Sequence, residues 1–113
     1  MTPVPLNSLA ERLEHLISPD RIADFAVRWK ITELALFGSV LRDDFAADSD
    51  VDVLVSFNPA ATWSLWDLTA MEDELTAIIG RKVDLVEKEA LRNPFRRQHI
   101  LNGRKAIYVS SQG

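Results

Sequence analysis

The segment LFGSVLRDDFAADSDVDVLV, residues 36–55, contains two apolar runs separated by a turn and a group of acidic residues. The first run ends at Gly38-Ser39, a pair typical of turns, and the second carries Asp50 and Asp52 at its start. Side chains alternate between the two faces of a strand. Both aspartates are therefore expected on one face and the valines that follow them on the other. Two like charges at the start of an apolar strand oppose folding, and some favourable interaction must offset their repulsion.

A third acidic residue lies in a later apolar run, residues 82–87. If that strand lies beside residues 51–57, the same alternation brings Asp84 to the face that carries Asp50 and Asp52. At an effective dielectric constant of about 20, two unit charges about 4 Å apart repel by about 4 kcal/mol, a large part of a small domain's stability. Divalent cations such as Mg²⁺ take oxygen ligands and would make this interaction favourable. We therefore expect the three aspartates to bind metal.

The turn at Gly38-Ser39 suits a phosphate group. A glycine at a strand end, followed by a serine at a helix start, lets backbone N–H groups and a hydroxyl surround an anion near the positive end of the helix dipole. A phosphate site beside a carboxylate cluster can hold a nucleoside triphosphate through its metal ions. This combination predicts a phosphoryl- or nucleotidyl-transfer site.

Each feature alone has a simpler interpretation. Gly-Ser after a strand is usually only a turn, and Asp84 alone would more often be a surface acid on an edge strand. A calcium loop starting at Asp48 is excluded, because it needs glycine at its sixth position and glutamate at its twelfth, where the chain has Val53 and Pro59. The nucleotide-site prediction therefore depends on the order and spacing of all these residues together.

The rest of the chain reads as alternating helices and strands without repeats. Apolar spacing and capping residues predict helices at 6–17, 19–29, 64–80 and 94–103, and strands at 31–37, 51–57, 82–87 and 106–109. Ser64 begins a capping box, and Asn93 is the predicted N-cap of the last helix. This order indicates a small α/β domain in which helices cover a mixed sheet. We expect one domain over residues 1–113, with N-terminal helices in residues 1–30 and the catalytic core in residues 31–109.

Composition limits the environment and the partners. The chain has 113 residues, 47% of them hydrophobic, and lacks cysteine, which fits a single globular domain in a reducing compartment. Its net charge of -4 argues against direct DNA binding, which needs a basic surface. The N-terminal sequence has no apolar run of membrane-spanning length and no leader-like basic start. We expect a cytoplasmic protein with no membrane partner.

The sequences GSVLR at 38–42, SDVDVLV at 49–55 and KVDLV at 82–86 resemble the signature of the minimal nucleotidyltransferases. These MNT proteins belong to the DNA polymerase beta superfamily, and many are antitoxins encoded beside HEPN-domain toxins. The resemblance covers roughly residues 31–109. It implies a nucleotidyltransferase (polymerase beta-like) fold and a metal-dependent enzyme, with ATP as the nucleotide donor and two Mg²⁺ ions, or Mn²⁺ in their place.

The resemblance also assigns roles to single residues. It implies that Asp50 and Asp52 bind both metal ions, and that Asp84 helps to bind the catalytic metal and to activate the attacking hydroxyl. The Gly38-Ser39 turn would hold the terminal phosphates. Arg42 matches the arginine of the motif and is a further candidate for nucleotide binding. In this chain Asp43 follows that arginine, where the family commonly has a glycine.

The acceptor is expected to be a macromolecule, because the chain has no residues left for a domain that would hold a small acceptor. By resemblance it is a HEPN-type helical RNase toxin, silenced when AMP is transferred to a tyrosine or another hydroxyl, which makes the chain a protein adenylyltransferase and antitoxin. Two alternatives stay open: a catalytically silent antitoxin that inhibits by binding, and a small-molecule nucleotidyltransferase acting as a dimer. A homo- or hetero-oligomer fits each of them.

Three groups of residues remain without a defined role. The basic residues near the last helix form either a solvated face or a contact with a triphosphate, an acidic partner or RNA: Arg92, Arg96, Arg97, Arg104 and Lys105. Trp63 and Trp66 pack at a helix start or anchor a partner. His15 and His99 have no nearby Cys or His at ligand spacing, so a zinc site is not expected.

Overall fold

The structure is a computed structural model that describes residues 17–41 and 50–110. The predicted helix at residues 6–17 therefore lies outside the described residues, apart from Ile17. The described elements follow in the order α2 (Pro19–Arg28), β1 (Ile31–Phe37), the 3₁₀ helix η1 (Gly38–Leu41), β2 (Val51–Phe57), α3 (Leu65–Ile79), β3 (Val83–Glu87), the 3₁₀ helix η2 (Lys88–Ala90), α4 (Pro94–Gly103) and β4 (Lys105–Val109). The bounds of β1 and β2 agree with the prediction, while β3 begins one residue later and β4 one residue earlier.

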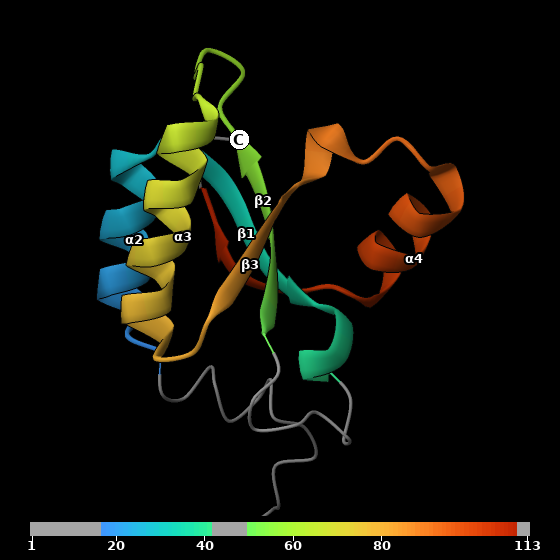
Figure 1. The fold of residues 1–113 in the computed structure, drawn as a ribbon, viewed down its shortest axis with the longest axis horizontal. Coiled ribbons are helices and arrows are strands. Elements are labelled where there is room, and N and C mark those ends of the chain that lie inside the picture. The colour runs from blue at the N-terminus through green and yellow to red at the C-terminus, as the bar shows by residue number, and fades with distance from the viewer. Residues whose placement is uncertain (1–16, 42–49, 111–113) are drawn as a thin grey trace, which may run out of the picture.

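The four strands form one mixed sheet in the order β3-β2-β1-β4. Strand β1 pairs antiparallel with β2 and with β4, whereas β2 pairs parallel with β3. Helix α3 provides the crossover that a parallel β2–β3 pair requires. Helices α2 and α3 lie together against one face of the sheet, and α4 lies on the opposite side (Figure 1). The predicted α/β class with a helix-covered mixed sheet is confirmed.

The central strands β1 and β2 are largely buried on both faces, and β2 contributes to both cores. Val51, Val53 and Val55 point into the larger core, which also contains residues of α2 and α3 such as Phe25 and Met71. The opposite face carries a second, smaller cluster made of Ala35, Phe37, Leu54, Leu91 and Ile100. Two-sided burial explains the continuous apolar character of β1 and β2. The start of β2, where Asp52 lies, borders the smaller cluster.

Side-chain caps fix the limits of α3 and α4. Ser64 and Asp67 form a capping box, in which the Ser64 N–H donates to Asp67 Oδ2 at 2.9 Å and the Asp67 N–H donates to Ser64 Oγ at 3.2 Å. Helix α3 ends at Gly80, which has a positive φ of 81°. Asn93 Oδ1 accepts hydrogen bonds from the first N–H groups of α4, as its predicted role as N-cap requires.

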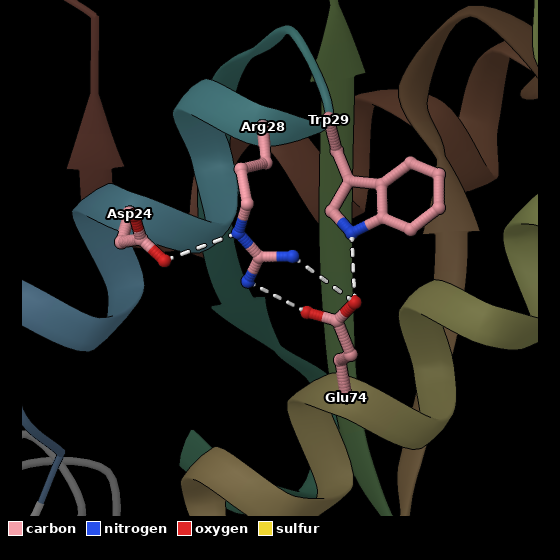
Figure 2. A network of polar contacts seen from close by, with 4 residues as sticks. All are labelled: Asp24, Arg28, Trp29 and Glu74. Carbon is pink, nitrogen blue, oxygen red and sulfur yellow. Dashed lines mark hydrogen bonds and ion pairs between the residues drawn. The ribbon is translucent and has the colours of Figure 1, made fainter.

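A polar network joins α2 to α3 (Figure 2). The guanidinium of Arg28 donates to Asp24 at 3.1 Å and to both carboxylate oxygens of Glu74, at 2.9 and 3.3 Å, and these bonds, that to Glu74 above all, raise the pKa of Arg28. Glu74 also accepts from Trp29 Nε1 at 3.3 Å. Trp29 in turn packs edge-on against Trp63, with ring centroids 5.1 Å apart. Trp63 therefore has the packing role that the sequence left open.

Candidate active site

Three strands bring one row of side chains to the face of the sheet on which α4 lies. Phe37 of β1 is the register partner of Asp52 in β2, and Asp52 is the partner of Asp84 in β3. Register partners point to the same face, and neighbouring strands lie about 4.8 Å apart. Asp52 and Asp84 are therefore adjacent, which confirms the predicted neighbourhood of their strands.

Gly38 lies directly against the Asp52 carboxylate. Its φ of 74° is in the left-handed region, which glycine adopts readily. A Cβ atom added at Gly38 would collide with Asp52 Oδ2 and lie 3.3 Å from Asp52 Cγ. The turn and the carboxylate thus form one compact unit. A phosphate-binding turn was a sequence-based reason for a glycine at this position, but no local signal indicated that an aspartate 14 positions later would require it.

The remaining predicted site residues differ in where they lie. Asp50 is exposed and immediately precedes β2, whose first residue is anchored by a 2.8 Å hydrogen bond from the Val51 N–H to the Lys82 carbonyl oxygen. Asp84 is exposed on β3, an edge strand of the described sheet. Arg42 and the side chain of Ser39 lie outside what the structure describes.

The carboxylate chemistry of the predicted ligands suits a hard cation. All the predicted ligands are carboxylates, and Asp52 and Asp84 supply oxygen donors from adjacent register positions, which is the ligand type that Mg²⁺ prefers. Within residues 17–41 and 50–110, however, no three acidic, histidine or cysteine side chains form a ready metal-binding group. The structure thus brings two of the three predicted ligands together, and Asp50 does not complete a set of three with them. Its role as a ligand stays a prediction.

A pocket of about 340 Å³ begins at the same turn. It lies between η1 and α4, and its lining residues are Phe37, Gly38, Leu41, Arg96, His99, Ile100 and Gly103. Because Gly38 touches Asp52 and Phe37 is the register partner of Asp52, the pocket lies beside the carboxylates. The sequence did not predict this pocket, since it depends on how α4 packs over the sheet.

No helix in the described part of the chain is long and apolar enough to cross a membrane.

Comparison with known proteins places this geometry in a family. The nucleotidyltransferase domain family matches residues 20–107, which include the described strands β1, β2 and β3. The protein adenylyltransferase MntA of Thermococcus cleftensis is 31% identical over 99 residues, covering 88% of this chain and 94% of that protein.

Two solved structures share the fold. A chain of a toxin–antitoxin crystal structure with AMP-PNP superposes with a TM-score of 0.65 at 20% identity, covering 85% of this chain and 77% of that one. A chain from the complex of a tri-AMPylated Shewanella oneidensis HEPN toxin with an MNT antitoxin gives a TM-score of 0.58 at 19% identity, covering 90% and 75%. The domain match over residues 20–107 and the Thermococcus cleftensis relative show that the chain belongs to the nucleotidyltransferase domain family.

Proposed function

We propose that this chain is an antitoxin that transfers AMP from ATP to a hydroxyl group, a tyrosine in the first instance, on a HEPN-type RNase toxin. The observation that carries the proposal is the unit formed by Gly38, Asp52 and Asp84, which combines a left-handed glycine turn with two adjacent carboxylates. The relative from Thermococcus cleftensis is named a protein adenylyltransferase, which supports AMP transfer to a protein. The complex of an AMPylated HEPN toxin with an MNT antitoxin supports a HEPN toxin as the acceptor.

The carboxylates would hold Mg²⁺ together with the triphosphate. When bound, Mg²⁺ neutralises phosphate charge and makes the acceptor hydroxyl more acidic. Asp50 would join Asp52 and Asp84 around the cation, because a cation between carboxylates replaces their mutual repulsion with attraction. The missing Cβ of Gly38 keeps the backbone close to Asp52, so that phosphate oxygens can approach both the turn and the ligands.

The position of Asp84 suits a macromolecular acceptor. It is exposed on β3, at the edge of the described sheet, where a hydroxyl on another protein can reach it. In the transfer, the acceptor oxygen forms a bond to the α-phosphorus of ATP, the bond from that phosphorus to pyrophosphate breaks, and the hydroxyl proton is released. Asp84 would orient the hydroxyl and assist the loss of this proton.

The experiment mixes the purified chain with a HEPN-type toxin as the partner, ATP and Mg²⁺, and measures the intact mass and the RNase activity of that partner. Wild type should add AMP and abolish RNase activity, and the inhibition should persist after the two proteins are separated. Asp84→Asn should retain appreciable ATP binding but leave the partner unmodified. Asp73→Asn is a matched control, because Asp73 is an exposed acid of α3 and lies away from the carboxylate face.

The second candidate function is inhibition by contact alone. It would replace AMP transfer if Asp84→Asn neutralised the partner as well as wild type did, with no gain of mass on either protein. A small-molecule nucleotidyltransferase would require neither a stable complex with the partner nor its modification.

A further inference from the structure

The basic residues around α4 divide into two groups according to their contacts. Arg97 Nη1 donates to the Lys88 carbonyl oxygen at 2.8 Å, and Arg104 Nε donates to Glu33 Oε2 at 2.7 Å. Glu33 also forms a 3.5 Å ion pair with Lys88. These contacts fasten the two ends of α4 and the neighbouring η2 to the sheet, so Arg97 and Arg104 have structural roles.

Arg96 belongs to the other group. Its guanidinium makes no hydrogen bond or ion pair with any residue in the ranges 17–41 and 50–110, and its side chain is exposed. Arg96, His99, Ile100 and Gly103 follow one another at helical spacing and therefore share one side of α4. Ile100 is buried in the smaller core, while Arg96 and His99 line the pocket beside it.

The pocket has walls of different chemical character. Gly38 and the apolar residues Phe37 and Leu41 form one wall, and α4 contributes Arg96 and His99 to the other. Since Gly38 contacts the Asp52 carboxylate, the basic wall faces a space that begins at the acidic site. A ligand that suits both sides carries a cation toward the carboxylates and additional negative charge toward α4. A metal-bound chain of phosphates has this distribution of charge.

We propose that Arg96 and His99 bind the diphosphate part of the nucleoside triphosphate, from the side opposite the Gly38 turn. This inference rests on the proposed function. A guanidinium can donate two parallel hydrogen bonds to phosphate oxygens, and a histidine ring can donate from its protonated nitrogen. When the bond between the α- and β-phosphates breaks, negative charge develops on the departing pyrophosphate. Arg96, bound to these phosphates, therefore stabilises the leaving group as well as the triphosphate.

The same pocket could instead hold the nucleotide base against Phe37, Leu41 and Ile100. The two assignments differ in which part of ATP Arg96 contacts. A base or ribose contact affects ATP and AMP alike, whereas a contact to the β- and γ-phosphates affects ATP alone.

The test measures the affinity of the full chain for ATP and for AMP, each with Mg²⁺, by displacement of a fluorescent ATP analogue at constant ionic strength. Arg96→Gln should weaken ATP binding by about ten- to hundred-fold, the range expected for a charge-assisted contact, and change AMP binding by less than about two-fold. His99→Gln should have a smaller effect in the same direction. Arg92→Gln is the control, because Arg92 is exposed, precedes α4 and does not line the pocket, yet its loss changes the net charge equally.

Unchanged melting temperatures will show that the variants remain folded. The inference is wrong if Arg96→Gln binds ATP as wild type does, if Arg92→Gln loses as much affinity, or if AMP binding falls as far as ATP binding. If wild type itself binds no ATP, both the proposed function and this inference are wrong. Normal wild-type binding together with an unaffected Arg96→Gln would refute the role of α4 alone.

Discussion

Replacing Gly38 with alanine tests the contact between the turn and the Asp52 carboxylate. The backbone cost of a Cβ at the left-handed φ of 74° is roughly 1–2 kcal/mol. The new Cβ would also collide with Asp52 Oδ2. Because that oxygen is the end of a side chain, the carboxylate can rotate away, at about 0.5–1.5 kcal/mol if it leaves its preferred rotamer. The total loss of stability should therefore be roughly 1.5–3.5 kcal/mol, and the displaced carboxylate should weaken Mg²⁺-dependent ATP binding.

Gly80→Ala provides the matched control. Gly80 has a similar φ of 81°, but a Cβ there meets nothing within 4 Å, and the residue ends α3 away from the carboxylates. This variant should lose only the backbone part, roughly 1–2 kcal/mol, and bind ATP normally. Urea unfolding and ATP titration in Mg²⁺ measure both effects.

A double-mutant cycle isolates the collision itself. In an Asp52→Ala background, Gly38→Ala should cost about as much as Gly80→Ala does in wild type, because the colliding oxygen is absent. Three results together would refute the reasoning. Gly38→Ala and Gly80→Ala would lose equal stability, Gly38→Ala would bind ATP normally, and removal of the Asp52 carboxylate would change neither of these results.

Further substitutions test the phosphate turn, the metal site and the fold. Gly38→Val should weaken ATP binding more than Ser39→Ala, which removes one hydroxyl and leaves the backbone N–H groups; equal affinity in both variants and wild type would contradict a phosphate role. Millimolar Mg²⁺ with ATP should raise the melting temperature of wild type, and Asp50→Asn should lose most of that rise, whereas an equal rise in both would exclude Asp50 as a ligand. Ser64→Ala should cost about 1 kcal/mol in urea unfolding by removing the N-cap of α3. Ile100→Ala should cost about 2–5 kcal/mol, because Ile100 is only 6% exposed where α4 packs on the sheet; a smaller loss would show that α4 is weakly held.

Local signals predicted much of the fold. The alternation of apolar and acidic residues in β2 placed the valines in the core and Asp52 on the other face, and the Ser64 and Asn93 caps located the starts of α3 and α4. These signals depend on neighbouring residues, so a single sequence contains them. The adjacency of Asp52 and Asp84 was predicted only on the condition that β2 and β3 pair, and the parallel register meets that condition.

Features that depend on packing between distant segments could not be predicted. Long-range contacts produce three such features: the close approach of Gly38 to Asp52, the pocket under α4, and the different contacts of the basic residues. Arg96, Arg97 and Arg104 look alike in the sequence, yet Arg97 donates to η2, Arg104 donates to Glu33 of β1, and Arg96 lines the pocket. The expected meeting of all three carboxylates depends in addition on a cation, whose attraction would have to overcome their repulsion.

The central claim is that the chain transfers the AMP part of ATP to a hydroxyl on its partner. The most direct test incubates the chain and the partner with Mg²⁺ and ATP carrying a radioactive phosphorus at either the α or the γ position, and then separates the proteins under denaturing conditions. Label from the α position should remain covalently bound to the partner, and label from the γ position should leave as pyrophosphate. Label retained from the γ position would indicate phosphoryl transfer, and no retained label from either position would show that the chain acts without group transfer; each result would contradict the account.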